Sequence, residues 1–353
     1  MESTAQYWKP LWLDLEPHIS RLHLAQAHSN RAPKGRKHDF GDAKRLLRRL
    51  VCGELVLSFV PDAEQRAWRM LLRGKLQLVR ERVRLSNQLE ALLEEMRIKL
   101  SSVISELLGL SGRRILEALA HGENDPSKLA DLGDRRLRCS KEELADALTG
   151  PVEPLQRKML RWSLDRLHLL DGQIAAMDLC AAEAMRKHAD AVIRLAEVPG
   201  FGPDSAHQLI AEVGPEAKAF PTAGQLASWV GVCPGRQESA EHNQNSRSPK
   251  GNRYARRLLT QAAQAAVKKS GSHFQRAFRR LLPRLGYNAA IWAIAHKLCR
   301  LVWNILHHGV QYIEQGQETN PKARKDRIRK MINELRRLGY TVFPPSATPS
   351  SAG

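Results

Sequence analysis

Two groups of side chains in this 353-residue chain have the types and spacing needed to act on phosphate esters. The first group lies in a polar segment between Gly231 and Gly251, where serines are set among basic residues. The hydroxyls are those of Ser239, Ser246 and Ser248, and the cations are Arg236, Arg247, Lys250, Arg253, Arg256 and Arg257. A serine oxygen can attack phosphorus, and fixed cations stabilise the charge that develops there. The alternative is a solvated basic loop that contacts nucleic acid without reacting.

The second group is acidic. Asp39 and Asp42 stand three residues apart at the start of a helix predicted over Ala43–Val51. That spacing places both carboxylates on one helical face, where they could share hard cations such as Mg²⁺. The alternative is structural, with Asp39 capping the helix and Asp42 serving as a charge in its first turn.

A glycine-rich turn, Pro199-Gly200-Phe201-Gly202, precedes a helix predicted from Ser205 to Val213. Glycines allow positive φ, so successive backbone amides can converge on an anion. The N-terminus of the following helix adds a positive end at the same place. The pattern indicates a helix-hairpin-helix-like element, which holds a nucleic-acid phosphate without reading bases.

Composition supports a polyanionic partner. The net charge is +19 and the isoelectric point is near 10.1. The five cysteines are dispersed without a Cys-x-x-Cys pair, which favours reduced thiols in a cytosol over disulfides or a zinc site. The most apolar stretch, Ala289–Leu306, is broken by His296, Lys297 and Arg300, so we expect no membrane span.

The elements that must position these groups are predicted to be mostly helical. Apolar residues step by three and four over 63–110 and 155–188, which predicts two long helices that pair antiparallel in a coiled-coil-like manner. Their leucine stripe serves either an intramolecular core or a dimer interface. Capping boxes are predicted at Ser140/Glu143 and Thr222/Gln225. The remaining predicted elements are a strand over Arg21–Ala27, helices over Arg253–Lys269, Phe274–Leu282, Ala289–His308 and Lys322–Leu338, and a disordered end after Phe343.

Three stretches carry a family resemblance: MESTAQYWKPLW at 1–12, GRKHDFGDAKRLL at 35–47, and LASWVGVCPGRQESA continuing to KGNRYAR within 226–256. Together they resemble bacterial insertion-sequence transposases of the IS110 type, closest to the IS1111 subgroup, and the resemblance covers nearly the whole chain in order. It implies a recombinase with a split active site. A RuvC-like, ribonuclease-H-type α/β domain supplies an Asp-Glu-Asp-Asp metal site, a C-terminal domain supplies a serine nucleophile, and a structured RNA guides the choice of DNA.

Carried onto this chain, the resemblance makes Glu2, Asp39 and Asp42 the metal carboxylates for Mg²⁺, and Ser239 in QESA the nucleophile. The family's first carboxylate lies on an opening strand that we expect to be encoded upstream of Met1. The expected nucleic-acid-binding residues are Pro199, Gly200, Gly202, Arg236, Arg247, Lys250, Gly251, Asn252, Arg253 and Arg256. The loop departs from the family pattern at Glu241 and Ser246, where glycines are usual.

Four regions are therefore expected. They are a partial RuvC-like domain at 1–62, a helical coiled-coil-like region at 63–190, a serine transposase domain with the helix-hairpin-helix-like element at 191–312, and a basic tail at 313–353. The expected function is DNA strand cleavage and rejoining in transposition, in the bacterial cytoplasm at the nucleoid, by a homo-oligomer with a guide RNA. The alternatives are a truncated, inactive nucleic-acid-binding remnant and a Holliday-junction-type nuclease that uses only the metal site.

Overall fold

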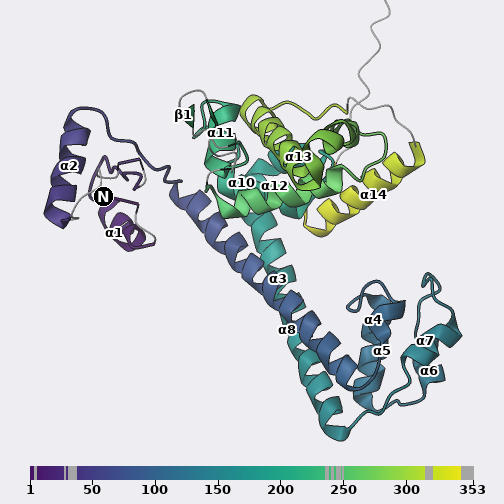
Figure 1. The fold of residues 1–353 in the computed structure, drawn as a ribbon. Helices are drawn as coiled ribbons and strands as arrows, with labels where there is room; N and C mark the ends of the chain where they lie inside the picture. The colour runs from purple at the N-terminus through teal and green to yellow at the C-terminus, as the bar shows by residue number, and fades with distance from the viewer. Residues whose placement is uncertain are drawn as a thin grey trace, which may run out of the picture. The chain divides into compact units, whose positions relative to one another are not determined.

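The computed structural model describes residues 1–3, 6–27, 29–30, 38–234, 238–239, 242–243, 248, 250–314 and 321–342. These residues are mostly helical, which confirms the predicted fold class. The chain divides into two compact units, Met1–Arg66 and Ala67–Gly353. Figure 1 labels the elements of both.

The first unit contains α1 (Trp8–Leu15) and α2 (Asp39–Val51). Of the strand predicted over Arg21–Ala27, the structure shows only isolated β-bridges at Ala25. Ala25 bridges to Glu2 on one side and to Leu57 on the other. These pairings each extend over only one or two residues, so no continuous ladder forms among the described residues of this unit. A RuvC-like α/β sheet therefore remains a prediction.

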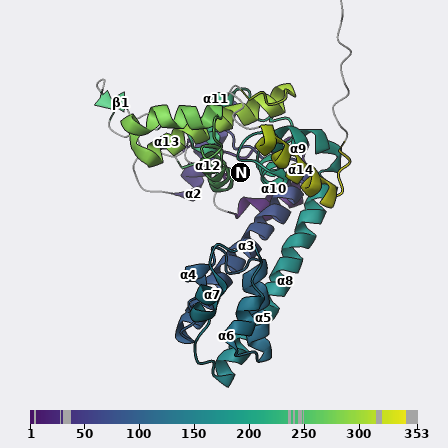
Figure 2. The ribbon, with the colours of Figure 1, turned by 90° about the vertical axis from the view of Figure 1, so that its right-hand side faces the viewer.

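Two long helices, α3 (Ala63–Glu95) and α8 (Pro154–Ala184), run side by side in opposite directions (Figures 1 and 2). Ion pairs fix the antiparallel register, with Lys75 on Asp178 and Arg82 on Asp171. Leucines of the predicted stripe, including Leu89 and Leu160, are buried between elements of the same chain. The stripe thus serves an intramolecular core.

The helix predicted over 63–110 ends earlier, at Glu95. Arg97 has φ 61°, a left-handed conformation that a helix cannot continue through. The chain then forms a lobe of four helices, whose core includes Met96, Leu116 and Leu129. They are α4 (Leu100–Val103), α5 (Leu110–His121), α6 (Pro126–Asp131) and α7 (Lys141–Ala147). The predicted capping box at Ser140 and Glu143 opens α7, as expected.

The main core lies at the other end of the long pair. It is formed by α9 (Ala189–Ala196), α10 (Pro203–Val213), α11 (Ala223–Val230), α12 (Arg253–Ala266) and α13 (His273–His308), together with residues of α3 and α8. The short 3₁₀ helix η1 (Arg186–His188) lies between α8 and α9 and buries none of its residues. The capping box of Thr222 and Gln225 opens α11, and the helix ends at Val230, as predicted. A short hairpin, β1 (Glu238–Ser239) with β2 (His242–Asn243), lies between α11 and α12.

Helix α13 joins the two helices predicted over 274–282 and 289–308. Its backbone is non-helical at Gly286, with φ 73°, so a sharp bend separates two helical parts. Among the described residues α13 alone is long and apolar enough to cross a membrane, but half of its most apolar window is buried within the protein. Ile294, Leu298 and Val302 belong to the main core, which explains that apolar character.

The basic helix α14 (Pro321–Arg337) is anchored to the second unit. Leu335 is fully buried, and Tyr340 just beyond the helix hydrogen bonds to buried His207 on α10, with 2.6 Å between Oη and Nε2. Burial lowers the pKa of His207 to about 4 and raises that of Tyr340 to about 12, so both are neutral at pH 7. The helix of the predicted basic tail therefore has an apolar side that packs on the second unit. The predicted disordered end after Phe343 lies outside the described residues.

Candidate nucleic-acid interface and active site

The hairpin between α9 and α10 requires glycine at Gly200. Its φ is +93°, and a Cβ there would lie 2.2 Å from the carbonyl oxygen of Ala262 on α12. The Phe201 amide donates to Val198 O at 3.1 Å, and the Gly202 amide donates to Ser205 Oγ at 2.8 Å. These two amides already have partners within the chain. A phosphate at this hairpin would therefore depend on nearby side chains and on the helix N-terminus more than on the expected nest of amides.

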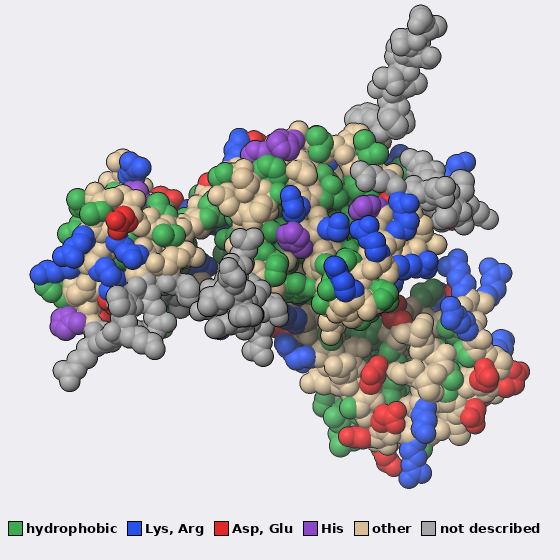
Figure 3. Space-filling model, turned by 45° about the horizontal axis from the view of Figure 1, so that its top comes forward, with side chains coloured by type: hydrophobic (Ala, Val, Ile, Leu, Met, Phe, Trp, Pro, Cys, Tyr) green, Lys and Arg blue, Asp and Glu red, His purple; other side chains and the backbone are tan. Residues whose placement is uncertain are grey.

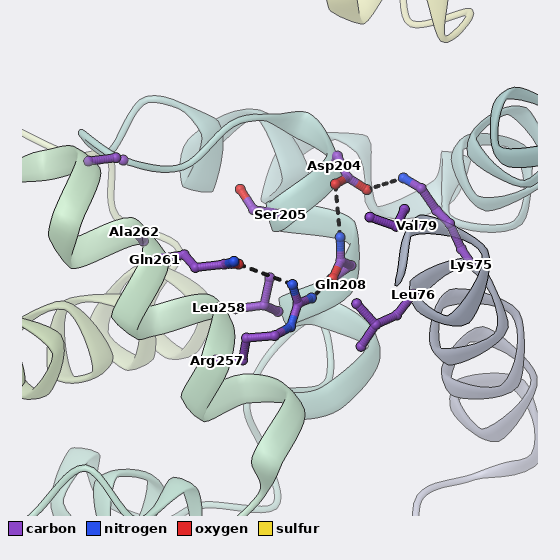
Figure 4. A pocket seen from close by; sticks show the side chains of 12 residues that line it. Lys75, Leu76, Val79, Asp204, Ser205, Gln208, Arg257, Leu258, Gln261 and Ala262 are labelled. Atoms are coloured by element: carbon purple, nitrogen blue, oxygen red, sulfur yellow. Dashed lines mark hydrogen bonds and ion pairs between the residues drawn. The ribbon is translucent and has the colours of Figure 1, made fainter. Parts of the chain in front are cut away.

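A pocket of about 330 Å³ lies beside this hairpin, between α3, α10 and α12 (Figure 4). Part of the lining is apolar and includes Leu76, Val79 and Leu258. The rest includes the polar or charged side chains of Lys75, Asp204, Ser205, Gln208, Arg257 and Gln261. Lys75 forms ion pairs with Asp204 and Asp178. Burial by itself lowers the pKa of Lys75, but these carboxylates outweigh burial and raise it overall.

Arg257 is the other cation of the pocket. It donates to the amide oxygens of Gln208 at 2.9 Å and Gln261 at 3.1 Å, and its Nε is buried without a hydrogen-bond partner in the described part of the chain. Burial and the nearby charge of Arg80 lower the pKa of Arg257. This guanidinium contributes positive potential beside Gly200 while its hydrogen bonds go to neutral amides.

The serine loop, residues 231–251, is described only in part. Ser239 is on β1 opposite His242 on β2, and its side chain lies outside the description, as do Arg236, Glu241, Ser246 and Arg247. Ser248 is described: its Oγ accepts a hydrogen bond from Trp292 Nε1 of α13 at 2.6 Å. This bond ties the later part of the loop to the core helix.

The end of the loop is fixed by two residues that were expected to bind nucleic acid. Gly251 packs so closely on α11 that a Cβ would lie 2.3 Å from Val230 O. Asn252 caps α12, its Oδ1 accepting from the amides of Tyr254 and Ala255 at 2.9 and 3.0 Å. Both residues therefore have structural roles.

A buried carboxylate that the sequence reading missed completes this anchor. Glu212, 3% exposed, accepts from Asn252 Nδ2 at 2.7 Å and from Arg73 Nε and Nη2 at 2.7 and 2.8 Å. Arg69 donates to the main-chain oxygens of Ala211 and Glu212. The available signal was a lone carboxylate in the apolar run LIAEV, where an unpaired charge would be costly.

Cations and rings surround the start of α12. Arg73 lies 4.3 Å and Arg253 lies 4.9 Å from the ring centroid of Tyr254, and Arg256 lies 5.5 Å from that of Trp292. Lys250 and Arg253 are exposed, while Arg256 is half-buried. Of the predicted basic contacts that the structure describes here, Lys250 at the end of the loop and Arg253 at the start of α12 are thus directly available to a phosphate.

The predicted metal carboxylates lie in the first unit. Asp39 is the first residue of α2 and follows the N-cap His38, so the alternative of Asp39 as N-cap is wrong. Asp42 forms an ion pair with Arg45 at 2.5 Å, and Glu2 takes part in the bridge to Ala25. Within the ranges that the structure describes, no three acidic, histidine or cysteine side chains gather into a group that could hold a metal ion.

Comparison with known proteins gives the family. Residues 193–279 match the transposase family described as IS116/IS110/IS902, and residues 1–98 match a transposase family described as DEDD and IS110. The chain belongs to the IS110 family of transposases. It is a transposase of an IS110-family insertion element, as the resemblance predicted.

Two of three relatives of this IS110-family transposase are themselves named as transposases, and the third is a protein of an insertion element. It is 28% identical over 318 residues to a Pseudomonas aeruginosa protein named Probable family 20 transposase, covering 88% of this chain and 83% of the relative. The y4pF/y4sB protein of Sinorhizobium fredii, also named as a transposase, is 25% identical over 80% of this chain and 65% of its own length. A 42 kDa protein of the insertion element IS900 from Mycobacterium paratuberculosis is 28% identical over 40% and 36%.

The match of residues 1–98 to the DEDD family suggests that this IS110-family transposase depends on a divalent metal. Glu2, Asp39 and Asp42 are the carboxylates that the resemblance assigns. In the described arrangement they do not fit a shared ion, because they form no cluster and Asp42 is engaged by Arg45.

Proposed function

We propose that this transposase binds duplex DNA and cuts and rejoins its strands with Ser239 as the nucleophile. The observation that carries the proposal is the anchor at the end of the serine loop. Gly251, Asn252 and Glu212 fix the loop's last residues to α11, α10 and α3, directly before a helix that begins with exposed Arg253. A nucleophile must be held at a fixed place relative to the phosphate that it attacks, and the anchor supports such a role.

In the proposed step the Ser239 oxygen attacks a DNA phosphorus and loses its proton to a base. The new bond joins Oγ to phosphorus, and the bond from phosphorus to one deoxyribose oxygen breaks, so that this oxygen leaves as a hydroxyl after taking up a proton. Rejoining reverses the process, with a strand hydroxyl attacking the phosphoserine ester and Oγ leaving. One phosphoester bond replaces another in each step, so no external energy source is needed.

The surrounding charge supports this chemistry. Lys250 and Arg253 are exposed next to the anchored end of the loop and can stabilise the charge of a phosphorane-like transition state. The proposal includes a divalent metal because the first part of the chain matches the DEDD family. Binding such a metal would require Glu2, Asp39 and Asp42 to come together with a further carboxylate. The proposal also includes a structured guide RNA, a homo-oligomer and a location in the bacterial cytoplasm at the nucleoid.

A second candidate function is nucleic-acid binding without catalysis. Glu241 and Ser246 favour it, because both replace glycines that are usual in the family and Glu241 adds a negative charge two residues after Ser239 in the sequence. A nuclease that uses only the metal site is the third candidate. The three differ in two observables, the cleavage of DNA and the covalent protein–DNA adduct.

The test uses the full chain, expressed in bacteria with a plasmid that carries the element and its flanking sequence. The proposal predicts excision products and a covalent protein–DNA adduct in the wild type. Ser239→Ala should abolish both, and Ser101→Ala, at an exposed position on α4, should leave both unchanged. DNA binding without excision or adduct would support the binding-only function. Cleavage that persists in Ser239→Ala would support the nuclease.

A further inference from the structure

The chain contains no aspartate or glutamate between Glu241 and Glu314. Over this run, which includes α12 and α13, the basic residues are Arg247, Lys250, Arg253, Arg256, Arg257, Lys268, Lys269, Arg276, Arg279, Arg280, Arg284, Lys297 and Arg300. In Figure 3 blue Lys and Arg side chains gather on one face of the second unit, while red Asp and Glu side chains gather over the lobe of α4–α7. The basic balance is thus concentrated in part of the molecule.

Three arginines stand out on the first part of α13. Arg279, Arg280 and Arg284 are exposed, and we call them the arginine row. The opposite side of the same helix is buried, with Phe274 and Ala277 inside the main core. The helix is therefore held firmly by its apolar side and presents the row to solvent.

The arginine row has no carboxylate partner among the described residues, whereas buried or bridging arginines elsewhere in the unit do. Arg73 is paired with Glu212, and Arg82 and Arg113 share Asp171. Like charges four residues apart on a helix, such as Arg280 and Arg284, destabilise it. A row that is neither paired nor needed for packing is typical of a surface that receives an anionic partner.

The row is also connected to the serine loop through its own helix. Beyond the bend at Gly286, Trp292 of α13 donates to Ser248 of the loop, and Arg256 of α12 lies against the Trp292 ring. One helix therefore carries the row and also holds the loop. Because the same helix carries the row and holds the loop, the DNA on which the loop is proposed to act is the favoured partner of the row.

We propose that the arginine row binds the phosphate backbone of duplex DNA beside the serine loop, an inference that rests on the proposed function. The row extends from Arg279 to Arg284, which is five residue steps or about 7.5 Å along the helix axis. One strand of B-DNA carries a phosphate every ~3.4 Å along the duplex, so the row matches two to three consecutive phosphates. Guanidinium groups suit this task because they form paired hydrogen bonds to phosphate oxygens.

The test measures equilibrium binding of the full chain to a fluorescent 30-base-pair DNA duplex over a range of salt concentrations. Each phosphate contact contributes about 0.9 to the slope of log K against log salt. Replacing all three row arginines by glutamine should reduce that slope by roughly 2 to 3 and weaken binding on the order of 10²-fold at 0.1 M salt. The matched control replaces Arg135, Arg136 and Arg138, three exposed arginines of the lobe, and removes the same net charge.

The control variant should change the slope of log K against log salt by less than about 0.9, the contribution of one phosphate contact. Equal effects of the two triple variants would overturn the proposal, because diffuse net charge would then explain binding. A slope change seen with a structured RNA and absent with duplex DNA would overturn it as well. Circular dichroism and thermal unfolding establish that both variants are folded. The binding assay does not depend on catalysis. Its result can therefore be interpreted even if the wild-type protein forms no covalent adduct through Ser239.

Discussion

Replacing Glu212 by glutamine removes the negative charge at the centre of the loop anchor while keeping the size and shape of the side chain. The carboxylate receives two charge-assisted hydrogen bonds from Arg73 and one hydrogen bond from Asn252. A glutamine can still accept from Asn252, but its amide group would face a guanidinium donor. The variant therefore tests the charge pairing and spares most of the packing.

The expected loss is large because the pair is buried. The Glu212 side chain is 4% exposed and that of Arg73 is 27% exposed. Removing one partner of a buried ion pair costs about 3 to 5 kcal/mol. Since water can partly reach Arg73, we expect the lower end, about 3 kcal/mol. For a unit of this size that corresponds to a fall in melting temperature of roughly 6 to 12 °C.

Thermal and urea unfolding of the full chain measure this loss. Glu183→Gln is the control, since Glu183 pairs with Arg186 at the surface with both side chains more than 60% exposed, and it should cost at most about 1 kcal/mol. In the double variant Glu212→Gln with Arg73→Met, the loss should be smaller than the sum of the single losses by at least about 1 kcal/mol. Hydrogen exchange should quicken at the first turn of α12 in Glu212→Gln. A loss no larger than that of Glu183→Gln would refute the reasoning.

Three further outcomes are expected. Gly200→Ala should destabilise the protein by about 2 to 4 kcal/mol in urea unfolding, because φ is positive there and the new Cβ would clash with the Ala262 carbonyl oxygen. The control Gly202→Ala should cost less than about 1 kcal/mol, because its backbone is extended and the space around it is open. Lowering the pH from 6.5 towards 4 should weaken the fold by up to about 1.4 kcal/mol per unit, since unfolded His207 gains a proton that folded His207 resists; a pH profile unchanged by His207→Asn would contradict this. Trp292→Phe removes the donor to Ser248 and should speed trypsin cleavage at Lys250, with cleavage in the lobe unaffected.

Local patterns predicted the helices well because their determinants lie within a few residues. Thr222 and Gln225 form the predicted capping box, and the glycine after Val230 ends α11 in a left-handed conformation. The end of α3 was missed because Arg97, an ordinary residue, adopts positive φ there and carries no sequence signal for it.

Contacts between distant segments were harder to predict. Glu212 acquires its role only through Arg73 and Asn252, which lie 139 residues before it and 40 residues after it. Asn252 was assigned to nucleic acid, although asparagine before a helix is also a common cap. The arginine row was visible in the sequence as basic residues, but its exposure and its lack of carboxylate partners depend on the packing of α13.

Helix α3 links the lobe to the loop anchor as one continuous rod. Arg69 and Arg73 lie one turn apart on it, and the helix then continues without a break to Glu95 at the lobe. The distance from Arg73 to Glu95 is about 33 Å of helix. A tilt of a few degrees at the anchored end of α3 displaces its other end by a few ångströms. A force applied to the lobe would, in the same way, act through α3 on the contact between Arg73 and Glu212. A single continuous helix thus connects the lobe of α4–α7 to the residues that anchor the end of the serine loop.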